Sequence, residues 1–166
     1  MKTREYNRNE AVKYAEKWAY RRNPRYYNFN ELGGDCTSFA SHCIYAGSKI
    51  MNYKKYIGWY YNNLNNRAPS WSGVEFLHDF LINNKGVGPR ARKIKEIGDL
   101  QIGDLIQLKF NTMERFSHSL IVVAKNGNEL KKVFVATHTE DAYHKSVAEY
   151  NFESIRFLHI IDIGIW

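Results

Sequence analysis

The stretch GGDCTSFASHCIYAG, residues 33–47, places a cysteine shortly after a pair of glycines. Its apolar residues recur at the spacing of one helical face: Phe39, Ala40, Cys43 and Ile44. We therefore predict a helix over residues 36–46, with Gly47 as its C-cap. Cys36 then lies in the first turn, where free backbone N–H groups and the helix dipole favour the thiolate, the reactive form of a nucleophilic cysteine.

The chain has two cysteines, and Cys43 lies seven residues after Cys36 on the same predicted helix. Two helical turns separate the two α-carbons by about 10 Å, whereas a disulfide needs them within about 7 Å, so we expect two free thiols. Cys43 is mid-helix beside Ile44 and is expected in the core. Cys36 is either a second buried apolar residue or a nucleophile. Unpaired thiols are typical of a reducing compartment or a catalytic role.

The order of predicted elements indicates an α+β fold. Residues 9–22 form an amphipathic pattern that ends at Asn23-Pro24, and Ser72, three residues before Glu75, predicts the capped start of a third helix. Apolar runs with turn signals between them then predict four strands, at residues 105–110, 117–125, 129–137 and 157–163. Since turns and not helices join these strands, we predict an antiparallel sheet.

Composition indicates one globular domain over residues 1–166. The net charge of +7 favours anionic partners such as an acidic wall polymer, but no run of Lys or Arg exceeds two residues, so we predict no nucleic-acid binding. No apolar run approaches the roughly 20 residues of a membrane span. No signal peptide is visible, so the chain as given is expected in the cytoplasm, unless it is a domain of an exported protein. The oligomeric state stays open.

A nucleophilic cysteine needs an imidazole, and His118 stands at the head of an apolar strand between two serines. His138 closes the next strand. If Asn126-Gly127-Asn128 is a three-residue loop, His118 lies opposite Ala136 and His138 is its diagonal neighbour on the same face. A two-residue loop would place the two histidines on opposite faces. The remaining histidines lack such a setting: His42, His78, His144 and His159.

The stretch at residues 33–47, with Trp71, GDLIQL, SHSLIVV and ATHTED in that order, resembles the bacterial putative amidase domain of the papain-like superfamily. NlpC-type cell-wall peptidases and CHAP amidases are related to it. The resemblance extends from Tyr6 to about Ile163 and implies a papain-like (NlpC-type) fold. It implies Cys36 as nucleophile, His118 as general base and His138 as the orienting residue, with Asp141 as an alternative. The chain departs from the family at Ser38, often Asn, and at His42, often Gln.

The resemblance also implies the reaction, in which Cys36 attacks an amide carbonyl of a peptide or a peptidoglycan fragment, without cofactor or metal. The N–H of Cys36 is the expected oxyanion donor. The second donor is expected from the preceding loop, which offers Tyr26, Tyr27, Asn28 and Asn30. The expected substrate contacts flank the pair or belong to the aromatic stretch: Asp35, Thr37, Ser117, Trp59 and Trp71.

Two other classes of function compete with this interpretation. A zinc site could draw on the two cysteines with His118 and His138, but no CxxC or HxxxH spacing supports it. A catalytically inactive module could bind a peptide or wall polymer through the aromatic stretch from Tyr53 to Trp71. Reactivity of the Cys36 thiol distinguishes this module from an enzyme.

Overall fold

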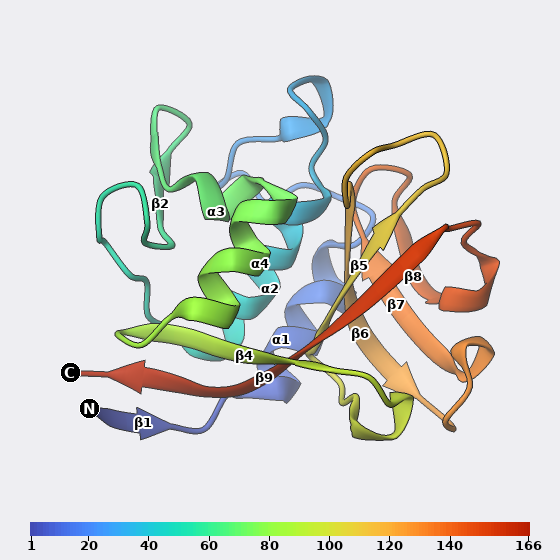
Figure 1. The fold of residues 1–166 in the computed structure, drawn as a ribbon. Coiled ribbons are helices and arrows are strands. Elements are labelled where there is room, and N and C mark those ends of the chain that lie inside the picture. The colour runs from blue at the N-terminus through green and yellow to red at the C-terminus, as the bar shows by residue number, and fades with distance from the viewer.

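The strands of the second half of the chain form one antiparallel sheet, which the computed structural model describes together with the rest of residues 1–166 (Figure 1). The strand order is β1-β9-β5-β6-β7-β8. Strand β4 lies off this path and also pairs with β9. The strands are β1 (Lys2–Arg4), β4 (Gly88–Ile94), β5 (Leu105–Lys109), β6 (His118–Lys125), β7 (Val133–Thr137), β8 (Ala142–Ser146) and β9 (Ser154–Ile165). A separate pair joins β2 (Tyr61–Asn63) to β3 (Asn66–Arg67).

The helices gather on one side of this sheet, with α2 packed against α1, α3 and β6 (Figure 1). They are α1 (Arg8–Trp18), α2 (Cys36–Ser48), α3 (Pro69–Ser72) and α4 (Val74–Asn83). Short 3-10 turns lie at η1 (Phe29–Glu31), η2 (Ile97–Asp99), η3 (Leu130–Lys132) and η4 (Val147–Glu149). The fold is therefore α+β with an antiparallel sheet. None of the helices has the length and apolar character needed to cross a bilayer.

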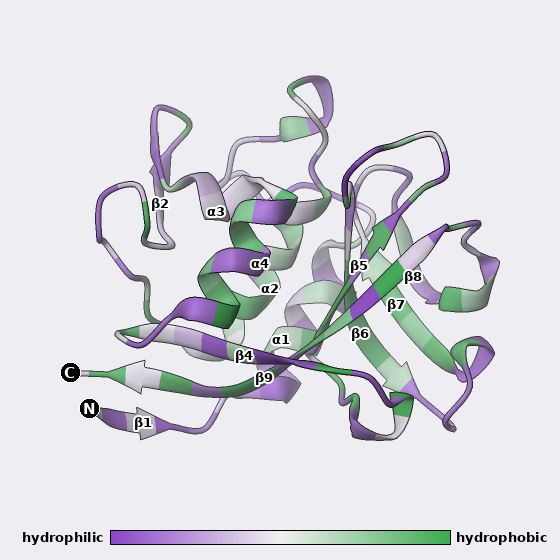
Figure 2. Cartoon of the chain, in the orientation of Figure 1, coloured by the Kyte–Doolittle hydropathy of each residue, from purple (hydrophilic) through white to green (hydrophobic).

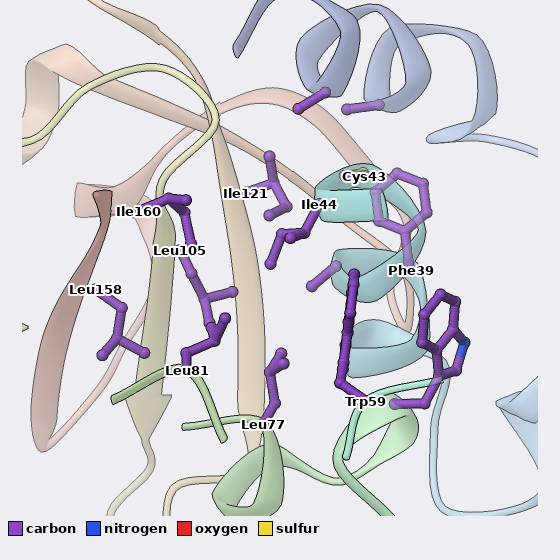
Figure 3. Packing of buried hydrophobic residues seen from close by; sticks show 14 of the residues in the cluster. Phe39, Cys43, Ile44, Trp59, Leu77, Leu81, Leu105, Ile121, Leu158 and Ile160 are labelled. Atoms are coloured by element: carbon purple, nitrogen blue, oxygen red, sulfur yellow. The ribbon is translucent and has the colours of Figure 1, made fainter. Parts of the chain in front are cut away.

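Apolar side chains fill both faces of the sheet, and Figure 2 shows the hydrophobic colour along α2, β6 and β7. On the helical face, Ile44, Leu77 and Ile121 belong to one large cluster, which Figure 3 shows between α2, α4 and β6. On the opposite face, Leu120 and Val122 belong to a second cluster beneath η4. Burying each such side chain stabilises the fold by about 1.5–3 kcal/mol. The alternation along β6 places Ser119 on the helical face and His118 on the other.

Helix α2 is the most enclosed element, since every residue but Tyr45 is buried. Its polar side chains are satisfied internally: Ser38 Oγ lies 3.0 Å from His42 Nε2, and Ser41 Oγ accepts from the Trp59 indole at 3.0 Å. Buried polar groups with partners cost little, whereas unpaired ones are expensive. The helix that carries Cys36 is therefore held firmly on all sides.

Several predicted boundaries need correction. Helix α2 continues past Gly47, and Lys49, with φ of 56°, makes the left-handed turn. Gly47 instead permits close packing, because a Cβ there would come within 2.5 Å of the Tyr6 ring. The predicted capping box at Ser72 is wrong: Gly73 is the N-cap of α4 and makes no side-chain cap. The predicted strand at 129–137 begins only at Val133.

Candidate active site

Cys36 begins α2 directly against the start of β6. Gly33 and Gly34 adopt φ of 86° and 97°, which only glycine adopts readily, and so turn the chain into the helix. The Thr37 hydroxyl lies 2.9 Å from the Ser119 hydroxyl, and Cys36 Sγ lies 3.9 Å from the Ser117 carbonyl oxygen. Because Ser117 and Ser119 flank His118, these contacts place the thiol beside the His118 backbone.

The His118 ring lies among aromatic side chains and makes no hydrogen bond with protein groups. Its centroid is 6.0 Å from the Phe110 ring and 5.8 Å from the Tyr150 ring. His118 is 7% exposed and Cys36 is 6% exposed, so both reactive groups are largely covered. An imidazole without a hydrogen-bond partner is free to accept a proton. In proteins without substrate, catalytic hydrogen bonds are often long or unformed.

Burial sets the protonation of both groups. It lowers the pKa of His118 from 6.5 to about 4, with a smaller contribution from the Lys145 ammonium. Burial also raises the pKa of the Cys36 thiol, and the Asp35 carboxylate adds to this. The N–H groups of Ser119 and Thr37 oppose the rise, because they hydrogen-bond the thiolate. At neutral pH Cys36 is therefore a thiol and His118 is a neutral imidazole.

The first turn of α2 has backbone N–H groups that lie outside the hydrogen bonds of the helix. The backbone N–H of Cys36 and that of Thr37 donate to no backbone carbonyl, and the first bond of the turn runs from Phe39 to the Asp35 carbonyl at 2.9 Å. Such groups at a helix N-terminus stabilise a developing negative charge. The start of α2 thus has a thiol and free backbone N–H groups, and the neutral imidazole of His118 follows on the adjacent strand start.

Asp35 anchors this turn to β7. One carboxylate oxygen accepts from the Phe29 N–H at 2.8 Å, and the other lies 2.6 Å from His138 Nδ1. His138 Nε2 lies 2.7 Å from the Trp18 carbonyl oxygen, and the ring stacks on Phe39 at 3.9 Å. Asp35 is therefore a structural residue of the site, and its side chain does not face a substrate.

The sequence predicted that His138 lies beside His118, but the structure does not bring the two histidines together. The loop after β6 is longer than the predicted three residues, since Lys125 pairs with Val133 and Ile121 pairs with Ala136. This register places the two histidines on opposite faces of the sheet. Both ring nitrogens of His138 also face oxygen acceptors already.

Asp141, the alternative orienting residue, makes no hydrogen bond with His118 either. It forms an ion pair with Arg22 at 2.8 Å. The same Arg22 lies 3.5 Å from the Asp35 carboxylate, so it ties the β7–β8 turn to the loop before α2. No protein group hydrogen-bonds the His118 ring, so the site described by the structure is a pair of residues without an orienting third.

The predicted aromatic contacts are part of the core. Trp59 and Trp71 are fully buried, with ring centroids 4.9 Å apart, because they cover the flank of α2. Thr37 is also buried, with its hydroxyl on Ser119. Of the predicted substrate contacts, only Ser117 is partly exposed, and its carbonyl faces the Cys36 thiol.

The residues of the loop before α2 that the sequence offered as oxyanion donors pack within the protein or lie at its surface. Tyr26 is buried and stacks on His42 at 3.7 Å, and the Asn28 side chain caps η1. The Asn30 side chain accepts from Arg22 at 3.1 Å. Tyr27 lies at the surface, with its ring packed edge-on against Phe29.

Sequence reasoning missed the side chains that surround His118. Lys145 of β8 and Tyr150 after η4 both lie beside it, together with Phe110. One signal was available: the spacing Ser146-x-x-Glu149 is that of a capping box, which the structure contains. It would have predicted an ordered turn immediately before Tyr150.

The chain belongs to the family described as "Putative amidase domain", which matches residues 5–161. This range contains every residue of the site described above. Membership of an amidase family suggests hydrolysis of a carbon–nitrogen bond.

A curated relative is "Uncharacterized protein YhbB" of Bacillus subtilis (strain 168), which is 34% identical over 164 residues. The match covers 95% of this chain and 51% of that protein, so the chain spans about half the length of its relative. No solved structure matches the chain.

Proposed function

We propose that this chain is a cysteine amidase or peptidase of the papain-like superfamily, with Cys36 as nucleophile and His118 as general base. The observation that carries the proposal is the start of α2 against β6. There a covered thiol lies beside the backbone of His118, whose ring has no hydrogen-bond partner in the protein. A cysteine at a helix N-terminus packed on an antiparallel sheet, with a histidine at a strand start, supports the papain-like assignment.

The proposed reaction is acyl transfer in two stages. His118 takes the thiol proton as the sulfur attacks the amide carbonyl carbon, and the Cys36 N–H stabilises the oxyanion. The C–N bond then breaks, and His118 returns the proton to the leaving amine. In the second stage a water molecule, deprotonated by His118, attacks the thioester carbonyl and releases the carboxylic acid and the free thiol.

The proposed substrate is a peptide amide, with cell-wall peptides as the first candidate. The net charge of +7 supports an anionic polymer as the partner, and the resemblance to cell-wall hydrolases supports the same class. The match to the amidase family supports the bond type.

The test is turnover of purified wall fragments and of a peptide library, read by mass spectrometry. Wild-type protein should release amide-cleavage products, and Cys36→Ala should release none. Cys43→Ala is the matched control, because it removes the other thiol, which is fully buried in the core, and should retain turnover if it folds. Equal turnover by Cys36→Ala and wild type would refute the catalytic role. Binding of these ligands without turnover by wild type would instead identify a module that only binds.

A further inference from the structure

Tyr150 lies beside the proposed nucleophile and base in a fixed position. It follows η4, whose capping box joins Ser146 and Glu149 in both directions, and its own N–H donates to the Val147 carbonyl at 3.1 Å. Its ring centroid is 5.8 Å from that of His118, and the Lys145 ammonium lies 4.2 Å from the ring centroid. The segment therefore presents one aromatic ring to the site.

The Tyr150 hydroxyl is buried and has no hydrogen-bond partner. The ring is only partly buried, so it is the polar end of the side chain that points into the protein. Covering a hydroxyl without a partner is unfavourable, and most buried polar groups avoid it. An unpaired donor beside a proposed active site is accounted for if the substrate supplies its partner.

The hydroxyl is a donor at neutral pH. Burial raises the pKa of Tyr150 to about 12, and the nearby charges of Glu140, Glu149 and Cys36 act in the same direction. His118 links the two residues in space, because its ring lies 5.8 Å from the Tyr150 ring and its backbone lies beside the Cys36 thiol. A neutral donor near the sulfur can stabilise an oxyanion that forms on the attacked carbonyl.

We propose that the Tyr150 hydroxyl is the second oxyanion donor, which acts together with the Cys36 backbone N–H. The proposal rests on the proposed function above. In the loop before α2, Tyr26 is stacked in the core, and the side-chain oxygens of Asn28 and Asn30 accept hydrogen bonds within the protein. Tyr150 makes no hydrogen bond to His118, so the geometry favours a contact with substrate over a role in orienting the base.

The test is Tyr150→Phe, which removes one oxygen and keeps the ring. With a substrate cleaved by wild type, kcat should fall by about 100-fold, as for other oxyanion donors, while KM changes little. The pH dependence of kcat/KM should keep its shape. Tyr143→Phe is the matched control: this tyrosine of β8 makes no hydrogen bond through its hydroxyl, so the variant should leave kcat unchanged.

Other outcomes would overturn the inference. An unchanged kcat in Tyr150→Phe would exclude the donor role. A fall in kcat with a shifted pH profile would show that Tyr150 positions His118. If Tyr150→Phe folds poorly, fluorotyrosine at position 150 serves instead: the ring is kept, and kcat should respond to the acidity of the hydroxyl, whereas no response refutes the proposal. Retained turnover in Cys36→Ala is a separate result, which refutes the proposed function itself.

Discussion

Lowering the pH from 7 to 5 is expected to destabilise the fold through His118. Its pKa is lowered to about 4 by burial, against an ordinary value of 6.5 in the unfolded chain. Between these values the unfolded state binds more protons than the folded state, so stability increases with pH. The stabilisation is complete above pH 6.5 and is lost as the pH falls toward 4.

The size of the effect follows from the two pKa values. For one group with a folded pKa of about 4, the loss between pH 7 and pH 5 is about 2 kcal/mol by linkage. His118→Gln removes the titrating group and keeps a polar side chain. Other groups contribute in both proteins, notably His42, whose pKa burial also lowers. The difference between wild type and variant therefore isolates His118.

Urea unfolding of both proteins at pH 7, 6 and 5 measures this difference. Wild type should lose about 2 kcal/mol more than His118→Gln over that interval, which follows from a folded pKa of about 4. Parallel losses in the two proteins would refute the reasoning, since His118 would then titrate in the folded state at its ordinary pKa. Such a result would also remove the argument that the base is neutral because it is buried.

Three further variants test other parts of the structure. Asp35→Ala removes the acceptor of His138 Nδ1 in the core and should cost about 3–5 kcal/mol of folding free energy in urea unfolding; a cost below 1 kcal/mol would contradict the anchor role. Trp59→Ala should cost about 3–5 kcal/mol as a core truncation, whereas weaker substrate binding at full stability would restore the sequence prediction. Lys145→Gln should raise the pKa of His118, measured by NMR of its ring protons; a lower value would contradict the assigned charge effect.

The helix that carries Cys36 could be predicted because its signals are local. The glycine pair and the apolar spacing of residues 33–47 place Cys36 in the first turn, and the structure confirms it. The buried position of Cys43 and the absence of a disulfide are also confirmed. The α+β class followed from the order of helical and extended patterns.

The partners of the site could not be predicted, because they depend on register and tertiary packing. The Asn126-Gly127-Asn128 pattern is a local turn signal. It carries no information about the turn at η3, which lengthens the loop. That change moved His138 to the opposite face. Strand β4 was missed because Gly88-Pro89 and three basic residues hide its apolar pattern, although it pairs with β9 along its full length.

The aromatic stretch illustrates the same limit. Trp59 and Trp71 are as compatible with a binding surface as with a core when only the sequence is read. Contact with α2 decides between the two: the Trp59 indole donates to Ser41 on that helix. Tyr150 shows the opposite case. No sequence pattern marks it as a site residue, yet its ring lies next to that of His118 in the structure.

The central claim is that His118 activates Cys36, and iodoacetamide labelling at pH 7 tests it without knowledge of the substrate. Peptide mass spectrometry gives separate labelling rates for Cys36 and Cys43 in wild type and in His118→Ala. The account predicts faster labelling of Cys36 than of Cys43 in wild type, and slower labelling of Cys36 in His118→Ala. Equal, slow labelling of both thiols, or a Cys36 rate that His118→Ala leaves unchanged, would contradict it.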